Sequence, residues 1–423
     1  MRTLRIGMSG TDVMEIQAML KKLGFYNAAP DGIFGPQTQR AVIEFQRRYG
    51  LTPDGIIGVN TYNAMRRYLL GYDTYTIVCG DTLYAIANRY GTAPDLILTA
   101  NPGIFPNSLR VAQRIIVPYG FDVVDTNIDY TYEIMERDIE GLKARYPFLE
   151  VGISGASALG RNLYYIRIGT GANQVFYNGA HHSLEWITVP VLMKFIEEFS
   201  RSYAQGQSLG GYDTQDIWNY SSIYIVPMVN PDGIELVLNG LQPNNPNYQE
   251  LIRWNNGSTD FSTNWQSNNR GVDLNHNYNA GWEQSKEAEA ALGITGPGPT
   301  RYSGLAPESE PEVQAMVEFT RSHNFRLVLA YHSQGEVIFW NFQNLAPPEA
   351  LRIGNMLSGV SGYRLEELTG IAAYAGYKDW FIKEYRRPGY TIEVGLGVNP
   401  LPISQFDGIY ADNLPILLLS SVV

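Results

Sequence analysis

The stretch VFYNGAHHSLEW, residues 175–186, joins the pattern that decides the fold to the pattern that decides the chemistry. Its first four residues form a short apolar run that predicts a buried strand. His182 and Glu185 follow three residues apart, so on a helical turn their side chains share one face. A strand that ends in such side chains is typical of an α/β domain, in which ligands bind at strand ends.

Strand-like and helix-like runs alternate on both sides of this stretch. The alternation predicts an α/β domain with a parallel or mixed central sheet. The expected strands are residues 164–169, 175–178, 223–229, 326–330 and 390–394, and the expected helices are residues 134–146, 189–203, 310–323 and 348–357.

His182 and Glu185 are candidate metal ligands. An imidazole nitrogen and a carboxylate on one face can both reach a Zn²⁺ ion at about 2.0–2.2 Å. A catalytic zinc needs a third protein ligand and an open position, and His332, after the strand expected at 326–330, is the candidate. Taken alone, the pair is better explained as a buried structural histidine beside a glutamate, so other motifs must decide.

The composition narrows the class of protein. The chain has 423 residues, 44% of them hydrophobic and 17% charged, which is typical of folded protein. Its single cysteine, Cys79, excludes an intrachain disulfide. Residues 1–120 hold 12 basic and 8 acidic residues, and the remainder holds 19 basic and 34 acidic residues. The resulting net charges of +4 and −15 argue against nucleic acid as a partner of the larger part.

No stretch is long and apolar enough to span a membrane. The N-terminus also lacks the apolar core of a secretory signal. We therefore expect a protein that stays in the cytoplasm until release, or one that associates with the cell wall or spore.

The first 70 residues contain two copies of a turn motif, DGIFG at 31–35 and DGIIG at 54–58. Helical runs flank both turns, and residues 38–49 place Ala41, Val42 and Phe45 on one face. With the Phe45-Gln46 pair, these turns resemble the three-helix peptidoglycan-binding domain, which we expect over residues 1–70.

Residues 72–120 follow another pattern, a short strand, a Gly-Asp-Thr turn, two helices and a final strand. Thr82 is expected to cap the first helix, with Ala85, Ile86 and Tyr90 on its inner face. The segment resembles a LysM domain, a βααβ module that binds glycans containing N-acetylglucosamine. Cys79 is interpreted as a small filler residue rather than a catalytic thiol.

Four further motifs accompany the His-x-x-Glu stretch in the third segment, residues 125–423. They are NPDG at 230–233, GVDLNHNY at 271–278, His332-Ser333, and YTIEV at 390–394. Together they resemble the zinc carboxypeptidase family of the carboxypeptidase A type. The resemblance implies an α/β/α sandwich around a mixed eight-stranded sheet.

The same resemblance implies roles for individual residues. His182, Glu185 and His332 would bind one Zn²⁺, and Glu393 would act as general base and acid. An arginine upstream of the Asp-x-Asn motif stabilises the oxyanion in the family. Arg270 is the favoured residue, although a strict count from Trp265 places Gln266 there.

The substrate positions depart from the family pattern. Asn275-His276 stands where the family has Asn-Arg, and Leu184 occupies the slot of a second arginine, so the clamp for a free α-carboxylate is weakened. His276 is either a substrate contact or a residue at the surface or behind the site. Lys378 takes the specificity position and favours an acidic substrate side chain, or is a solvated loop lysine. Tyr374 is the candidate for the family's mobile tyrosine, with Tyr377 as its competitor.

Two wall-binding modules joined to this domain predict a zinc peptidoglycan endopeptidase. The whole resembles the γ-D-glutamyl-meso-diaminopimelate peptidases of sporulating bacteria, whose partners are peptidoglycan glycan strands and stem peptides. Two other hypotheses are a metallocarboxypeptidase that removes C-terminal residues and a wall-binding protein with an inactive enzyme domain. The complete set of four zinc and base residues disfavours the last.

Overall fold

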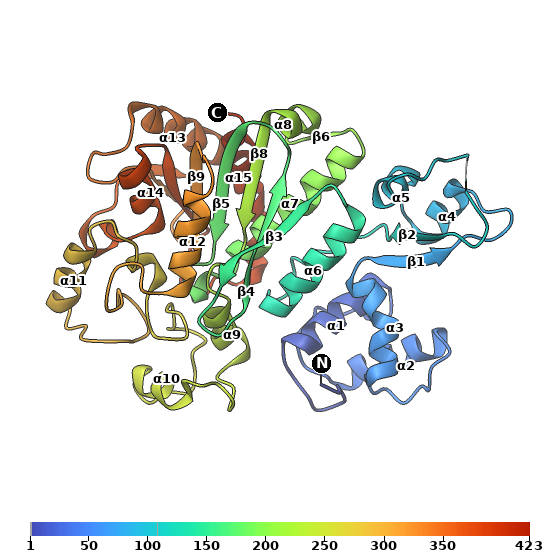
Figure 1. The fold of residues 1–423 in the computed structure, drawn as a ribbon. Coiled ribbons are helices and arrows are strands. Elements are labelled where there is room, and N and C mark those ends of the chain that lie inside the picture. The colour runs from blue at the N-terminus through green and yellow to red at the C-terminus, as the bar shows by residue number, and fades with distance from the viewer. Residues whose placement is uncertain (1, 108) are drawn as a thin grey trace. The chain divides into compact units, whose positions relative to one another are not determined.

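The computed structural model describes residues 2–107 and 109–423 (Figure 1). The chain divides into two compact units, one made of residues up to Leu149 with Glu197–Gln207, the other of Glu150–Ile196 with Ser208–Val423. Helix α6 (Tyr132–Arg145) therefore belongs to the first unit. The boundaries expected from the sequence, 1–70, 72–120 and 125–423, stay predictions.

The first unit begins with three helices, α1 (Thr11–Lys22), α2 (Pro36–Arg48) and α3 (Val59–Leu69). The predicted apolar face of α2 is confirmed, because Ala41, Val42 and Phe45 are buried in one cluster with residues of α1 and α3.

Each repeated turn is held by a buried glutamine. Gln46 donates from Nε2 to the Ile56 carbonyl at 3.0 Å and accepts at Oε1 from the Gly55 amide at 2.9 Å. Gln17 makes the equivalent pair of bonds at the first turn, to Ile33 and Gly32. The two turns are therefore the same structural device used twice.

The second module has the predicted βααβ order. Strands β1 (Tyr72–Thr76) and β2 (Arg114–Pro118) pair antiparallel, and α4 (Leu83–Tyr90) and α5 (Pro94–Ala100) lie between them in the chain. Thr82 caps α4 by accepting from the Ala85 amide, as predicted. The expected inner face was partly wrong: Ala85 is exposed, and Leu83 and Ala87 are buried with Ile86.

The second unit is built on a mixed eight-stranded sheet, which confirms the predicted fold class. The strand order is β11-β10-β12-β9-β5-β8-β4-β3. The central neighbours β12, β9, β5 and β8 run parallel, and the outer pairs β10–β12, β4–β8 and β3–β4 are antiparallel. The strands are β3 (Glu150–Ala156), β4 (Asn162–Ile168), β5 (Asn173–Gly179), β8 (Ser221–Val226), β9 (Leu327–Ser333), β10 (Val337–Phe339), β11 (Arg364–Glu366) and β12 (Gly389–Val394).

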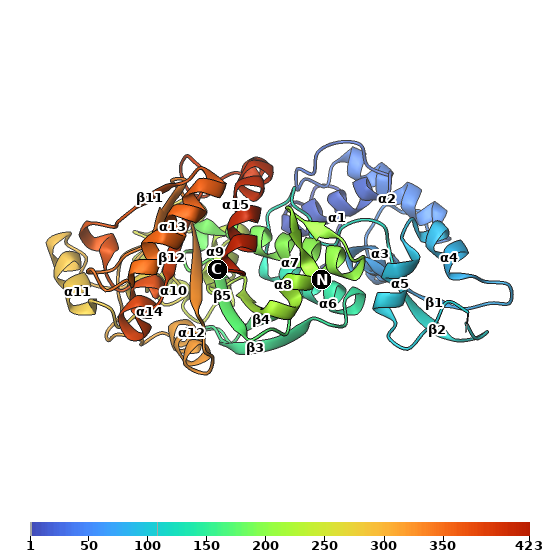
Figure 2. The same ribbon diagram turned by 90° about the horizontal axis from the view of Figure 1, so that it is seen from above.

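Helices cover both faces of this sheet (Figure 2). Alternate strand residues point to opposite faces. Phe176 packs with α12 (Pro311–Arg321) and α14 (Tyr377–Tyr385), while the Tyr177 hydroxyl donates to the Leu417 carbonyl of α15 (Phe406–Ser420).

The other elements are α7 (Thr188–Ala204), β6 (Ser208–Leu209), β7 (Tyr212–Asp213), α8 (Thr214–Tyr220), α9 (Pro231–Asn239), α10 (Tyr248–Trp254), α11 (Trp282–Ala291), α13 (Pro348–Ser361) and the short 3₁₀ turns η1 (Ser183–Glu185), η2 (Leu274–His276), η3 (Gly370–Ala373) and η4 (Ile403–Gln405).

Candidate active site

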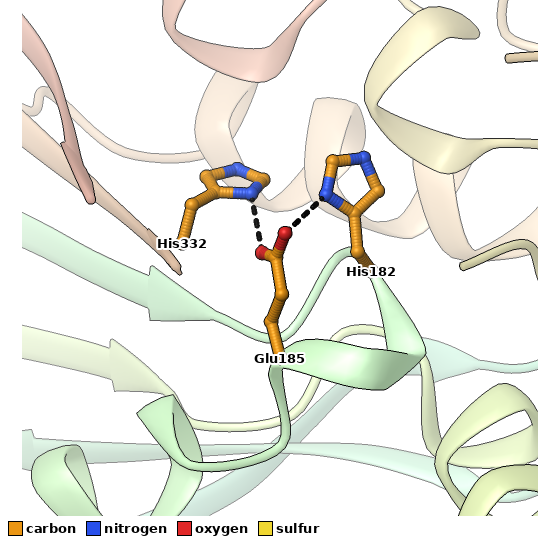
Figure 3. Close-up of side chains that lie close together, drawn as sticks. All are labelled: His182, Glu185 and His332. Atoms are coloured by element: carbon orange, nitrogen blue, oxygen red, sulfur yellow. Dashed lines mark hydrogen bonds and ion pairs between the residues drawn. The ribbon is translucent and has the colours of Figure 1, made fainter. Parts of the chain in front are cut away.

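The three candidate metal ligands meet at the carboxyl edge of the sheet. His182 and Glu185 follow β5, and His332 lies near the end of β9, which pairs with β5 in parallel. Because neighbouring parallel strands end at the same edge, residues 147 apart in the chain come together. His182 Nδ1 lies 2.9 Å from Glu185 Oε1, and His332 Nδ1 lies 2.8 Å from Glu185 Oε2. Figure 3 shows both imidazoles turned toward this carboxylate.

The loop that carries His182 is fixed by contacts on both sides. Ala180 adopts a left-handed backbone (φ 57°), which turns the chain away from β5. Asn230 donates from its side chain to the His181 carbonyl at 3.0 Å, and the Ser183 hydroxyl donates to the Trp265 carbonyl at 2.6 Å. The Asn-Pro-Asp-Gly motif and the segment before Asp273 therefore hold this loop in place.

Asp273 supports the same histidine from behind. Its Oδ1 lies 3.0 Å from His182 Nε2, and its Oδ2 accepts from the Arg301 amide at 2.8 Å. Burial works against ionisation of Asp273, but the adjacent His182 lowers its pKa well below the usual range. A carboxylate that fixes the outer nitrogen of a ligand histidine is a recurring part of zinc sites. Asp273 lies in the GVDLNHNY motif at 271–278, but no role was predicted for it from the sequence.

The donor set fits a catalytic zinc. Two imidazole nitrogens and one carboxylate have ligand atoms that all lie within 4.8 Å of one another. Three such ligands leave a position for water, as catalytic zinc requires. Burial opposes the charge on Glu185, but His182 and His332 lower its pKa to about 2. The carboxylate is therefore ionised at neutral pH, which is the form that binds a cation.

Glu393 faces this cluster from the next strand. It lies on β12, in register with His332 on β9. Burial and the negative charge of Glu185 raise the pKa of Glu393 well above its ordinary value. A carboxyl group with a raised pKa can both take and release a proton near neutral pH.

An open cleft of about 810 Å³ lies beside Glu393. Its lining combines polar residues with apolar ones, among which Leu292 and Val398 are 54% and 84% exposed. The lining residues used below are Leu184, Gln266, Thr300, Arg301 and Glu393.

Comparison with known proteins decides the family. A model of the zinc carboxypeptidase family matches residues 135–415, which is more than half of the chain. The chain belongs to the zinc carboxypeptidase family. The resemblance inferred from the sequence motifs is thereby confirmed.

Individual relatives agree with the family match. "Gamma-D-glutamyl-L-diamino acid endopeptidase 1" of Lysinibacillus sphaericus is 43% identical over 296 residues, covering 70% of this chain and 73% of that protein. The uncharacterized protein YqgT of Bacillus subtilis is 32% identical over 323 residues, covering 75% and 85%. The solved carboxypeptidase A from Helicoverpa armigera shares the fold, with a TM-score of 0.52 at 17% identity over 99% of this chain and 96% of that one.

The front segments also match known domains. Residues 9–65 match the peptidoglycan-binding domain and residues 75–118 match the LysM domain, as the sequence motifs predicted. Over the part of the chain that the structure describes, we find no helix long and apolar enough to cross a membrane.

Arg270, the favoured oxyanion residue, is not among the residues that line the cleft. The Arg270 side chain is 49% exposed and lies 3.8 Å from Glu310, and it does not line the cleft. Gln266, the other candidate, lines the cleft and accepts from the Thr300 hydroxyl at 2.7 Å. The oxyanion role of Arg270 or Gln266 stays a prediction; in the structure the Arg270 side chain lies toward Glu310, and Gln266 lines the cleft.

The expected contacts for the substrate carboxylate lie behind the cleft wall. His276 is buried in η2, with Nδ1 3.3 Å from the Ser285 hydroxyl, and burial lowers its pKa. Asn275 accepts from the Tyr377 amide at 3.1 Å. Neither residue is among those lining the cleft, as is also true of the three candidate metal ligands, so the substrate roles of Asn275 and His276 stay predictions.

Lys378 is buried rather than solvated. Only 2% of it is exposed, and its Nζ donates to the Asn341 carbonyl at 2.7 Å and lies 2.5 Å from Asp379. Its ammonium is thus already paired, which speaks against the expected contact with an acidic substrate. Tyr374 lines a separate cavity of about 250 Å³ with Asn341 and Asp379, and Tyr377 is buried in the core.

Proposed function

We propose that this chain is a zinc-dependent peptidoglycan hydrolase that cleaves the γ-D-glutamyl–meso-diaminopimelate bond of murein stem peptides. The observation that carries the proposal is one chain that joins the His182, Glu185, His332 and Glu393 cluster to two wall-binding domain matches. The relative named for γ-D-glutamyl-diamino acid bonds, 43% identical, supports the choice of bond.

We propose that one zinc ion binds per chain, through His182, Glu185 and His332. When bound, zinc polarises a scissile carbonyl and makes its water acidic. Glu393, in register with His332, takes a proton from the attacking water and passes it to the leaving amine. Asp273 keeps His182 oriented through Nε2. Elemental analysis of the purified chain tests the stoichiometry.

A metallocarboxypeptidase that trims C-terminal residues is the second candidate. Its family requires a cationic clamp for the terminal carboxylate at positions that here hold Leu184 and His276. Leu184 is apolar and His276 is buried away from the cleft. This structure therefore favours an endopeptidase, whose substrate continues past the cut.

The wall modules give the enzyme a place of action. We propose that they hold the chain on peptidoglycan, at the wall or the spore, after a cytoplasmic stage. A role in sporulation rests on the resemblance stated above and would be tested by locating the protein in fractions of vegetative cells and spores.

Mass spectrometry of digests tests the proposed bond. A stem tetrapeptide, L-Ala-γ-D-Glu-meso-diaminopimelate-D-Ala, should yield L-Ala-D-Glu and a diaminopimelate–D-Ala dipeptide. Release of D-Ala alone would instead assign the chain to the carboxypeptidases.

A further inference from the structure

The cleft beside Glu393 contains a cation that the sequence motifs did not identify. Of the described residues lining this cleft, Arg301 alone carries a positively charged side chain. The residue is exposed, and within residues 2–107 and 109–423 its guanidinium has no ion pair or hydrogen bond with the protein. Arg270, by contrast, lies 3.8 Å from Glu310.

The backbone of Arg301 is tied to the metal site. The two oxygens of Asp273 divide between His182 Nε2, at 3.0 Å, and the Arg301 amide, at 2.8 Å. The neighbouring Thr300 hydroxyl donates to Gln266. Arg301 has a left-handed backbone (φ 64°), which residues with a side chain rarely adopt, so these contacts hold it in one position.

The chain around the cleft is acidic, so a cation in the cleft matters for binding an acidic substrate. The chain after residue 120 carries a net charge of −15, which repels acidic substrates. Peptides of the proposed class are acidic on both sides of the cut. A γ-linked glutamate keeps a free α-carboxylate on the acyl side of the scissile amide, and diaminopimelate carries a side-chain carboxylate on the amine side.

We infer that Arg301 binds one of two substrate carboxylates, the α-carboxylate of the γ-linked glutamate or the side-chain carboxylate of diaminopimelate. The inference rests on the function proposed above and names the group that recognises its substrate. A guanidinium pairs with a carboxylate through two parallel hydrogen bonds, which fixes orientation as well as charge. Lys378, buried and paired with Asp379, is not free to do so.

The test compares Arg301→Gln and Arg301→Lys with wild type on four tripeptides. The parent is L-Ala-γ-D-Glu-meso-diaminopimelate. The second has the glutamate α-carboxylate amidated, the third has L-lysine in place of diaminopimelate, and the fourth carries both changes. Arg253→Gln, an exposed arginine on α10 outside the cleft, is the matched control. Zinc content and thermal unfolding of each variant check that the site and the fold are intact.

Arg301→Gln should lower kcat/KM on the parent about 10- to 100-fold, with a smaller loss in Arg301→Lys. The loss should disappear on the peptide that lacks the bound carboxylate. If amidation of the glutamate leaves kcat/KM of Arg301→Gln unchanged, Arg301 binds on the glutamyl side. If replacement of diaminopimelate by lysine leaves it unchanged, Arg301 binds on the diaminopimelate side. An equal loss on all four peptides, or no loss on the parent, overturns the inference.

Calorimetric binding of the same peptides to the zinc-free enzyme separates the two proposals. Zinc-loaded wild-type enzyme that leaves the γ-D-glutamyl bond of the parent uncut, although the zinc-free enzyme binds the parent, contradicts the proposed function. Parent binding that is unchanged in Arg301→Gln contradicts the role of Arg301, whatever bond is cut.

Discussion

At the residue scale, the chemistry depends on a few side chains at adjacent strand ends. His182, His332 and Glu393 could be predicted because each stands in a motif that follows or ends an apolar strand, and parallel strands bring such ends together. Arg301 could not be predicted in this way. It lies in an irregular loop with no periodicity, and its place depends on a hydrogen bond to Asp273.

Glu393→Gln should leave the metal in place and remove the proton carrier. We expect kcat to fall at least ~10²-fold. Zinc content by elemental analysis and turnover of the parent tripeptide are measured together. Glu366→Gln, on the exposed strand β11, is the control and should retain normal turnover. Near-normal turnover of a zinc-loaded Glu393→Gln would assign the base to another residue.

Asp273→Asn should weaken zinc binding, because the carboxylate that holds His182 Nε2 loses its charge. The expected loss of zinc affinity is about 10- to 100-fold. Competition with a chelator measures it, and Asp260→Asn, an exposed aspartate bonded to Ser262, provides the comparison. Equal zinc affinity in the two variants would show that Asp273 does not support the site.

At the element scale, the elements expected from the sequence exist, but others were not predicted, among them the 15-residue helix α15 and the seven-residue strand β3. The five expected strands and four expected helices all exist, with ends shifted by a few residues. The three-residue strands β10 and β11 were not predicted, because so few residues show no alternation. The first turn of α14 placed Lys378 in the interior, where pairing with Asp379 offsets the cost of burial. The sequence left two alternatives for Lys378, a contact with an acidic substrate side chain and a solvated loop lysine.

The repeated turns of the first module offer a direct test of element stability. Gln46→Leu would leave the Gly55 amide and the Ile56 carbonyl without their partner. We expect a loss of about 2–4 kcal/mol in the free energy of unfolding of this module. Gln37→Leu, an exposed glutamine on the same helix, should change it by less than about 0.5 kcal/mol. Urea unfolding followed by circular dichroism compares Gln46→Leu with Gln37→Leu. Equal effects would remove the special role of Gln46.

At the scale of the whole molecule, the chain combines two small wall-binding modules with one enzyme domain. Attachment to a polymer raises the local concentration of its peptides around the active site. The modules themselves should not alter the chemistry, because the zinc ligands, Glu393 and Arg301 all lie in the second unit.

Deletion of residues 2–120 should therefore separate attachment from catalysis. We expect activity on insoluble peptidoglycan to fall by at least ~10-fold. Activity on the soluble tripeptide should stay within about 3-fold, since its binding needs no second contact. Co-sedimentation with peptidoglycan reports the attachment. A truncated chain that sediments and digests the polymer like the full one would contradict the anchoring role.

The most direct test of the central claim identifies the bond that the full chain cuts, before its zinc is removed, after removal, and after zinc is returned. Mass spectrometry follows the stem tetrapeptide L-Ala-γ-D-Glu-meso-diaminopimelate-D-Ala with wild type, chelated and zinc-reloaded enzyme. We predict L-Ala-D-Glu and a diaminopimelate–D-Ala dipeptide from the first, no products after chelation, and the same products after reloading. Cleavage at another bond, or undiminished cleavage in the metal-free enzyme, would contradict the claim that this is a zinc-dependent γ-D-glutamyl-diaminopimelate peptidase.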